Sequence, residues 1–287
     1  MTILVTGGNG QLGSALRLAS AESSHRYIFT DIGELDITSA EAVEKIMARE
    51  GVEVVVNCAA YTAVDMAEEQ EDLADMINHK AVAILAEACN KLNATLVHIS
   101  TDYIFSGDAT EPIGESATPA PRNAYGRTKL AGERAIEKSG CRSIILRTAW
   151  LYSEFGKNFV KTMRHLTSTL PEVRVVADQV GTPTYAGDLA RAIATIIESG
   201  QLGKCGTYHY SNLGECSWYD FAVEIARESG NNNCKITPCT TEEYPTKAVR
   251  PRYSVLDKSR FIDTFGIAIP AWQQSLAECI KHLNEQQ

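Results

Sequence analysis

The sequence predicts an α/β fold: a doubly wound parallel sheet followed by a smaller C-terminal α/β lobe. Strand-like and helix-like segments alternate through residues 1–150, and the strand-like segments are short, apolar and rich in β-branched residues. Such strands are typical of a parallel sheet that helices cover on both faces. After about residue 150 the alternation loosens. We therefore expect a second unit over residues 151–287, with a stretch near 172–200 returning to the first.

Five apolar runs supply the predicted strands of the first unit. They are residues 2–5 (TILV), 27–31 (YIFTD), 53–57 (EVVVN), 95–100 (TLVHIS) and 143–147 (SIILR). Helices are expected between them where apolar residues recur three or four positions apart. These helices cover residues 12–19, 38–49 with Thr38 as N-cap, 81–92, and 124–138 ending at Ser139-Gly140.

The second unit is expected to be less regular. Helices are predicted over 158–166, 187–199, 217–229 and 272–283, and strands over 173–176 and 207–210. Ser217 is a suitable N-cap for the helix over 217–229, and Gly230 a suitable stop. Residues 231–253 are polar and have no clear period, so we expect them to be irregular.

Composition and charge argue against several classes of protein. The 287 residues are 44% apolar and 22% charged, as in ordinary globular proteins. A net charge of −9 disfavours binding to nucleic acids or anionic membranes. The eight cysteines include no C-x-x-C pair, so free thiols are expected. The start, MTILVTGG, lacks a signal-peptide pattern and no run of 18 apolar residues occurs, so we expect a cytoplasmic protein.

A glycine motif follows the first predicted strand. Gly7, Gly10 and Gly13 lie between that strand and the next helix, where glycines permit a tight turn and a close approach to a pyrophosphate. Asp31 ends the second strand, 18 residues after Gly13, where a carboxylate can bind an adenosine ribose. The motif predicts a Rossmann-type dinucleotide-binding domain over residues 1–150, with the substrate-binding lobe mainly over 151–287.

Asp31 also bears on the choice between NADH and NADPH. A carboxylate at this position disfavours a 2′-phosphate, and no basic residue follows it directly. We therefore favour NADH, with the use of both cofactors left open. Asp36 and Ile37 are candidates for contact with the adenine, although Asp36 is an equally good cap for the following helix.

Two groups of polar residues are candidates for acid–base chemistry. Tyr125 and Lys129 are four residues apart and share one helical face, where an ammonium would lower the pKa of the phenol. Such a tyrosine can protonate a carbonyl oxygen as hydride arrives. Ser100 and Thr101 end the fourth strand, and a hydroxyl there can bind the same oxygen. Because adjacent strand residues point to opposite faces, we expect only one of them to serve.

The chain resembles the extended short-chain dehydrogenase/reductases and, more narrowly, the dTDP-4-dehydrorhamnose reductase family. The matching segments run in the family's order over nearly the whole length. They are TGGNGQLG (6–13), VNCAAYTAVDMAE (56–68), HISTDYIFSG (98–107), NAYGRTKLAGE (123–133), RTAWLYSEFGKNF (147–159), DQVGTPT (178–184) and RPRYSVLD (250–257).

The resemblance implies a role for each matching position. Tyr125 would be the general acid, Lys129 would bind the nicotinamide ribose, and Thr101 would fill the usual serine position. The expected cofactor contacts are Gly7, Gly10, Gln11, Leu12, Gly13, Asp31, Asp36, Ile37, Ala59, Ala60, Tyr61, Tyr125 and Lys129. The expected substrate contacts are Val64, Thr101, Tyr103, Trp150, Arg250 and Arg252, the two arginines for the diphosphate. For Trp150 a core aromatic, and for the arginines a solvated loop, are the alternative interpretations.

The implied activity is the NAD(P)H-dependent reduction of the C4 ketone of dTDP-4-dehydro-L-rhamnose by a monomer or homodimer. Some family members hold magnesium with an acid on the first helix, where this chain has Ser14-Ala15-Leu16, so no metal is expected. Alternatives are another sugar-nucleotide reductase or epimerase of the same fold, or a non-catalytic regulatory subunit. Dehydratases usually place Asp-Glu after the threonine, whereas Asp102-Tyr103 follows here.

Overall fold

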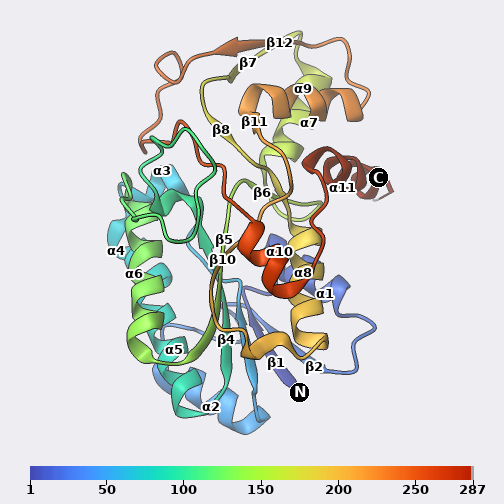
Figure 1. The fold of residues 1–287 in the computed structure, drawn as a ribbon. Helices are drawn as coiled ribbons and strands as arrows, with labels where there is room; N and C mark the ends of the chain where they lie inside the picture. Colours follow the sequence, from blue (N-terminus) through green and yellow to red (C-terminus); the bar gives the residue numbers. More distant parts are fainter. Residues whose placement is uncertain (286–287) are drawn as a thin grey trace.

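A six-stranded parallel sheet lies at the centre of the computed structural model, which describes residues 1–285 (Figure 1). Its strand order is β2-β1-β3-β4-β5-β10. The strands are β1 (Thr2–Thr6), β2 (Arg26–Thr30), β3 (Val54–Asn57), β4 (Thr95–Thr101), β5 (Arg142–Thr148) and β10 (Gly206–His209). Successive strands of the chain are added on both sides of β1, as in a doubly wound sheet.

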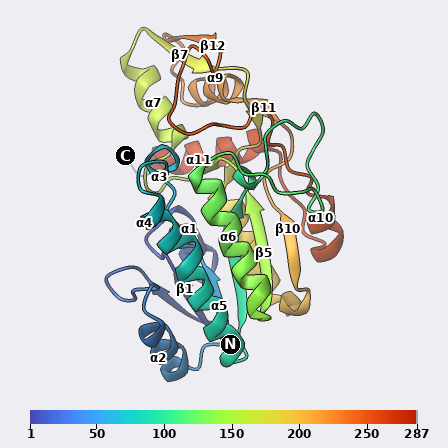
Figure 2. The ribbon, with the colours of Figure 1, turned by 90° about the vertical axis from the view of Figure 1, so that its left-hand side faces the viewer.

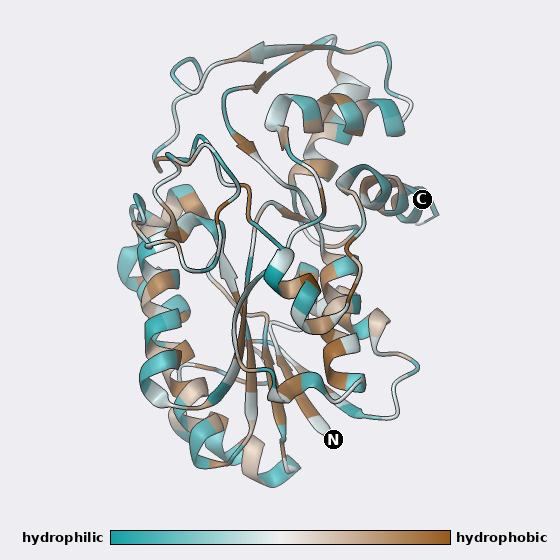
Figure 3. Ribbon diagram, viewed as in Figure 1, coloured by the Kyte–Doolittle hydropathy of each residue, from teal (hydrophilic) through white to brown (hydrophobic). Residues whose placement is uncertain are grey.

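Helices cover both faces of this sheet because its strands are apolar on both faces. Ile3 and Val5 pack toward α1 (Gln11–Ala19) and α8 (Ala186–Glu198). Leu4 lies between them in sequence and packs in the opposite core, with α2 (Ala40–Glu50), α5 (Ala81–Lys91) and α6 (Ala124–Ser139). Figure 3 shows apolar strands between helices whose outer faces are hydrophilic. The predicted α/β class and Rossmann-type sheet are confirmed.

A second cluster of helices and short strands lies in the upper half of Figures 1 and 2. Its helices α7 (Phe159–Thr169), α9 (Trp218–Glu228) and α11 (Trp272–Glu285) enclose a core of their own. Short strand pairs flank them: β12 (Lys235–Cys239) with β7 (Glu172–Val176), β11 (Cys216–Ser217) with β8 (Val180–Gly181), and β6 (Leu151–Tyr152) with β9 (Thr184–Tyr185).

Short helical segments complete the described chain. They are α3 (Val64–Ala67), α4 (Glu71–Asp75), the π-helical η1 (Met76–Lys80), the 3₁₀ segments η2 (Asp102–Ile104) and η3 (Gln201–Gly203), and α10 (Ser259–Phe265). No helix within residues 1–285 combines the length and the apolar character needed to cross a bilayer.

The structure differs from the sequence predictions at two local points. Residues 235–239 form β12, within the stretch expected to be irregular, and pair in parallel with β7. The strand was missed because it carries Pro238, which only an edge strand tolerates easily. The N-cap of α2 is Ser39, whose hydroxyl accepts from Ala42 N, and not Thr38.

Segments from the second half return to the central sheet. Helix α8 packs on α1, and β10 extends the sheet beside β5. By contrast, β7 lies within the stretch near 172–200 and pairs only with β12 among the described strands. The division into a cofactor domain and a substrate lobe stays a prediction.

A buried ion pair joins α6 to the central sheet. The Arg147 and Glu133 side chains are only 7% and 2% exposed. Arg147 Nη2 lies 2.7 Å from Glu133 Oε2, and Arg147 Nε donates to Glu133 Oε1 at 3.0 Å. Removing one partner would leave the other charge buried without compensation, which is strongly destabilising.

We therefore expect Glu133→Leu to lower the free energy of unfolding by about 3–5 kcal/mol. The double variant with Arg147→Met should recover much of that loss. Glu71→Leu is the control, because the Glu71–Arg127 pair is about half exposed and should contribute less than about 1 kcal/mol. Urea unfolding followed by circular dichroism measures all three. Equal losses in Glu133→Leu and Glu71→Leu would contradict the assigned role of the buried pair.

Candidate active site

The turn between β1 and α1 brings main chain against main chain. Gly7 has a φ of +64°, which favours glycine, and Gly10 N donates to Gly7 O at 3.0 Å. A Cβ on Gly13 would lie 2.3 Å from Gly7 O and 2.6 Å from Gly8 Cα. The turn can therefore close only with glycine at position 13, and this closure aims the start of α1 at the edge where β1 and β3 end.

The first turn of α1 is left without a side-chain cap. Gly10, the N-cap, offers none, so the free N–H groups of this turn can bind an anion. The Gln11 side chain is occupied elsewhere: it accepts from Ser153 Oγ at 3.1 Å and from Asn158 Nδ2 at 2.9 Å. Leu12 is buried. Both residues can therefore offer a phosphate only their main chain.

A cavity of about 350 Å³ lies beside this turn. Its lining includes seven of the predicted cofactor residues: Gly7, Gly10, Asp31, Asp36, Ile37, Ala59 and Ala60. Ile32 also lines it and is 74% exposed, an apolar surface suited to stacking against a flat ring. The structure thus brings these residues together at the point where the strand order reverses, the usual ligand position in such sheets.

The two acids of this cavity already hold main-chain groups. Asp31 Oδ2 accepts from Asn9 N at 3.0 Å. Asp36 Oδ1 accepts from the Thr38 hydroxyl and the Thr38 N, and these hydrogen bonds hold the pKa of Asp36 below its usual value. Asp36 therefore closes a turn before α2 while lining the cavity. The helix cap itself is Ser39, so the capping alternative for Asp36 is wrong.

Helix α6 begins with two caps that place Tyr125. Asn123 Oδ1 accepts from Gly126 N at 2.8 Å, and Glu68 Oε1 accepts from Ala124 N at 2.7 Å. A Cβ on Gly126 would lie 2.2 Å from Tyr103 O, so the absence of a side chain lets α6 approach η2. This approach brings Tyr125 toward the end of β4.

Thr101 and Tyr125 meet at this end of β4. The Thr101 hydroxyl lies near enough to the Tyr125 phenol to oppose the rise of its pKa. Thr101 Oγ1 donates to Asp102 Oδ1 at 3.1 Å and accepts from Tyr103 N at 3.2 Å. Ser100 Oγ is buried and has no hydrogen-bond partner among the described residues. Of the two hydroxyls expected from the sequence, the structure therefore brings Thr101 to the tyrosine.

The expected effect of Lys129 on Tyr125 is not seen. Burial raises the pKa of the Tyr125 phenol, and Asp102 adds to the rise, while the Thr101 hydroxyl opposes it. Lys129 Nζ is directed elsewhere, to the carbonyl of Ile99 at 2.6 Å. Burial lowers the pKa of Lys129 itself to about 8. The sequence interpretation was wrong because it counted the charge of the lysine and not the burial of both groups.

Two further tyrosines and an arginine lie around Tyr125. The Tyr103 ring meets the Tyr125 ring edge-on, with centroids 5.6 Å apart, and Tyr61 packs in the same apolar cluster as Tyr125. Arg250 Nη1 donates to the Tyr103 hydroxyl at 3.3 Å, and Arg250 Nη2 lies 2.6 Å from Asp65 Oδ2. Asp65 directly follows Val64 at the start of α3.

Arg250 forms an ion pair with Asp65 that the sequence did not suggest. Sequence spacing could not reveal this pair, because the two residues are far apart along the chain. The contact of Arg250 with a diphosphate stays a prediction. Arg252 is exposed, and both alternatives stated for it stay open.

Trp150 packs against the core that α7, α9 and α11 enclose. It has a φ of 49°, which is strained for a non-glycine residue, and its ring stacks on Trp218 with centroids 3.6 Å apart. A Cβ on Gly181 would lie 2.7 Å from the Trp150 ring, so glycine makes room for it. One face of the Trp150 ring is therefore packed in the core, while the residue as a whole remains half-buried. Its contact with a sugar stays a prediction.

Sequence reasoning missed four buried polar residues near the site. Asn57 and His98 lie in β3 and β4, and Asn78 lies in η1, where it hydrogen-bonds the main chain of Tyr61. Asp102 follows Thr101, and burial raises its pKa to about 6. The first two carried a signal, since Asn57 ends an apolar strand and His98 directly follows the apolar pair Leu96-Val97 in the middle of β4.

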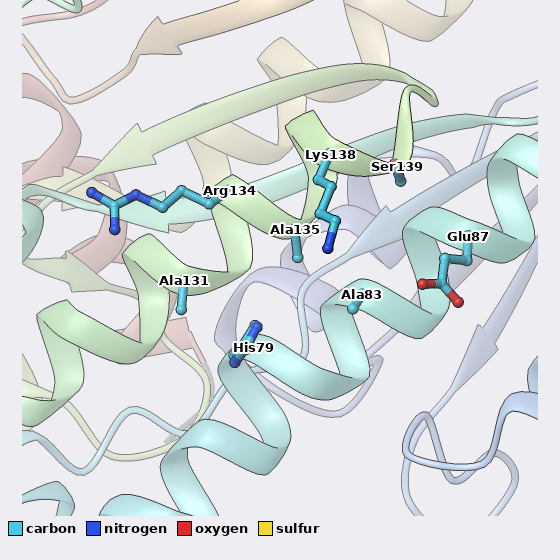
Figure 4. Close-up of a pocket in the computed structure, with 8 residues that line it drawn as sticks. All are labelled: His79, Ala83, Glu87, Ala131, Arg134, Ala135, Lys138 and Ser139. Atoms are coloured by element: carbon cyan, nitrogen blue, oxygen red, sulfur yellow. The ribbon is translucent and has the colours of Figure 1, made fainter.

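A second cavity, of about 400 Å³, lies in the groove between α5 and α6. Its lining includes His79, Glu87, Arg134 and Lys138 (Figure 4). It shares no lining residue with the cavity beside the β1–α1 turn. Within residues 1–285 no group of three or more His, Cys, Asp or Glu side chains is arranged to hold a metal ion.

Comparison with known proteins points in one direction. The family model described as the RmlD substrate binding domain matches residues 1–285. A dTDP-4-dehydrorhamnose reductase of Aggregatibacter actinomycetemcomitans is 39% identical over 96% of each chain. A solved dTDP-4-dehydrorhamnose reductase from Clostridium acetobutylicum is 48% identical and superposes with a TM-score of 0.95, over 99% of this chain and 100% of that one.

A second solved dTDP-4-dehydrorhamnose reductase, from Bacillus anthracis, is in complex with NADP. It is 38% identical, with a TM-score of 0.93 over 98% of this chain and 99% of that one.

The close approach at Gly126 can be tested directly. Gly126→Ala should destabilise the protein by about 1–3 kcal/mol, because the new Cβ overlaps the main chain of Tyr103. Gly114→Ala is the matched control, since a Cβ there meets no atom within 4 Å among the described residues. Thermal unfolding of both variants gives the comparison. If Gly126→Ala unfolds at the same temperature as the wild type, the contact does not constrain α6.

Proposed function

The chain belongs to the dTDP-4-dehydrorhamnose reductase family, and we propose that it reduces the C4 ketone of dTDP-4-dehydro-L-rhamnose to give dTDP-L-rhamnose. The observation that carries this proposal is the proximity of Tyr125 to Thr101 at the carboxyl edge of the sheet, the edge that also holds the glycine turn. A hydroxyl and a phenol that share one carbonyl oxygen are the groups that a ketone reduction needs.

The residues beside the β1–α1 turn fit a nicotinamide dinucleotide. The turn leaves no room for a Cβ at Gly13, and the first turn of α1 has uncapped N–H groups for a pyrophosphate. Asp31 would hold the adenosine ribose, and Lys129 the nicotinamide ribose. When bound, the dinucleotide supplies the hydride. The protein's own residues orient the ketone and supply the proton.

Tyr125 is the proposed proton donor. Because burial raises the pKa of its phenol, Tyr125 is protonated across neutral pH and can act as a general acid toward the C4 oxygen. The Thr101 hydroxyl holds the same oxygen and stabilises negative charge as it develops. Val64, Tyr103 and Trp150 would border the sugar ring, and Arg250, held by Asp65, would fix the Tyr103 hydroxyl.

The decisive assay supplies dTDP-4-dehydro-L-rhamnose, made in place from dTDP-glucose by a dehydratase and an epimerase. We expect NADH or NADPH to be oxidised only when both enzymes are present, with dTDP-L-rhamnose as product. Tyr125→Phe should lower kcat about 10²–10⁴-fold with little change in the Kd of the cofactor. Tyr244→Phe, at a tyrosine that is 56% exposed, is the control and should keep wild-type turnover.

Failure of this assay has two distinct forms. Near-normal turnover in Tyr125→Phe would remove Tyr125 as the proton donor while leaving the reaction in place. A folded wild type that binds cofactor and reduces no nucleotide sugar would overturn the reaction itself.

The cavity lining also supports a cofactor preference. Asp31 lines the site next to Ile32, and no Lys or Arg is among the lining residues in the described part of the chain. We propose that NADH is preferred, because a 2′-phosphate would face the Asp31 carboxylate without a cation. The test is the ratio of kcat/KM for the two cofactors. Asp31→Ser should shift this ratio toward NADPH, and a wild type with a higher kcat/KM for NADPH would contradict the proposal.

A further inference from the structure

A chain of buried polar groups crosses the sheet edge behind Lys129. It begins at Asn57, whose Oδ1 accepts from Ala59 N at 3.2 Å and from Thr6 Oγ1 at 2.7 Å. Asn57 Nδ2 lies 3.0 Å from His98 Nδ1, and His98 Nε2 lies 3.4 Å from Lys129 Nζ. These three linked side chains are inaccessible to water: Asn57, His98 and Lys129 are at most 1% exposed.

The direction of each hydrogen bond in this chain is fixed from one end. The Ala59 main-chain N–H can only donate, so the Asn57 atom that faces it must be the oxygen. The Asn57 amide then presents its N–H to His98 Nδ1, which must accept. A neutral imidazole that accepts at Nδ1 carries its proton on Nε2. His98 therefore points an N–H, and not a lone pair, at Lys129 Nζ.

His98 is neutral in this position. Burial holds the pKa of the His98 ring well below its usual value, and the nearby Lys129 adds to the effect. The ring therefore has one N–H, and Asn57 determines which nitrogen carries it. An ammonium at Lys129 would face this N–H with like polarity, whereas an uncharged amine could accept from it.

A second buried histidine shows the opposite arrangement. His209 Nδ1 lies 2.9 Å from Ile113 O, a group that can only accept, so Nδ1 carries the proton. His209 Nε2 then offers its lone pair to Arg147 Nη1 at 3.4 Å. The permanent cation Arg147 thus faces an acceptor, while Lys129 faces a donor at the same distance.

Other charges around Lys129 do not reverse this bias. Glu133, one turn further along α6, favours the ammonium, but Arg147 holds it in a bidentate ion pair. Asp102 lies buried in η2, against α6. The acids in and directly after α3 and in α4 that approach α6 include Asp65, Glu68, Glu71 and Asp75. They are bound to Arg250, Ala124 N, Arg127 and His79, respectively.

We propose that His98 is a positioning residue: through the tautomer that Asn57 imposes, it presents an N–H to Lys129 Nζ and disfavours the ammonium relative to the amine. The depressed pKa of Lys129, about 8, agrees with this. The link to turnover rests on the proposed function, because only there does the protonation state of Lys129 affect a reaction. The tautomer and the pKa of Lys129 do not depend on the substrate.

The first experiment reads the tautomer in the whole protein. Nitrogen NMR of protein carrying isotope-labelled histidine should show His98 as the Nε2–H form and His209 as the Nδ1–H form, with neither titrating between about pH 5 and 9. His98→Gln and His209→Gln assign the two signals by their absence. A His98 signal in the Nδ1–H or the charged form would overturn the proposal, and this holds even if His98→Gln fails to fold.

The second experiment reads the effect on Lys129. A glutamine at position 98 can turn its amide oxygen to the ammonium, so His98→Gln should raise the pKa of Lys129 by about one pH unit. Nitrogen NMR of labelled lysine, with Lys129→Met for assignment, measures it without substrate. His209→Gln is the matched control and should leave the pKa of Lys129 unchanged. If His98→Gln leaves it unchanged too, burial alone sets it and the proposal fails.

The third readout is the pH profile of kcat/KM. The limb set by Lys129 should lie near pH 8 in the wild type and move to higher pH in His98→Gln but not in His209→Gln. A wild type with turnover but the wrong His98 tautomer would refute this proposal and leave the function standing. The expected tautomer and pKa in a protein that reduces no nucleotide sugar would refute the function and, with it, the catalytic role given to His98.

Discussion

The site depends on how closely main chain can approach main chain at the carboxyl edge of the sheet. At Gly13 and Gly126 a Cβ would lie 2.3 Å from Gly7 O and 2.2 Å from Tyr103 O, respectively. The first contact aims α1 at the edge where β1 ends, and the second sets α6 against the end of β4. Parallel strands bring their carboxyl ends to one edge, but these two contacts decide what that edge presents.

Burial then decides the electrostatics of the groups at this edge. It raises the pKa of Tyr125 and lowers that of Lys129 to about 8. An exposed lysine beside a tyrosine would be a cation that stabilises the phenolate. Here the phenol is kept as an acid and the lysine loses its proton more readily than an exposed lysine, a combination suited to giving up a proton in the direction of reduction.

Polar contacts also join the second half of the chain to the cofactor side. The Gln11 side chain accepts hydrogen bonds from Ser153 and Asn158. Asn123 caps α6 and donates to Val249 O, and Ala248 N donates to Asp65. The segment around residues 247–250 therefore lies against α3 and the start of α6, so the elements that border Tyr125 come from distant parts of the chain.

The sequence alone determined the features that depend on near neighbours. The alternation of strand and helix, the glycine turn before α1 and the Tyr125–Lys129 spacing on α6 are local patterns, and local sterics are enough to interpret them. It did not reveal β12, because a polar strand with Pro238 forms only against its partner β7.

The tertiary structure determined the features that depend on long-range contacts and on burial. Arg250 pairs with Asp65, and Lys129 turns to Ile99 O and His98. The His98 tautomer is set by Asn57, 41 positions away in the chain. The sequence pattern identifies the residues that can carry charge. The pKa of each group, however, depends on its removal from water and on partners that only the folded chain supplies.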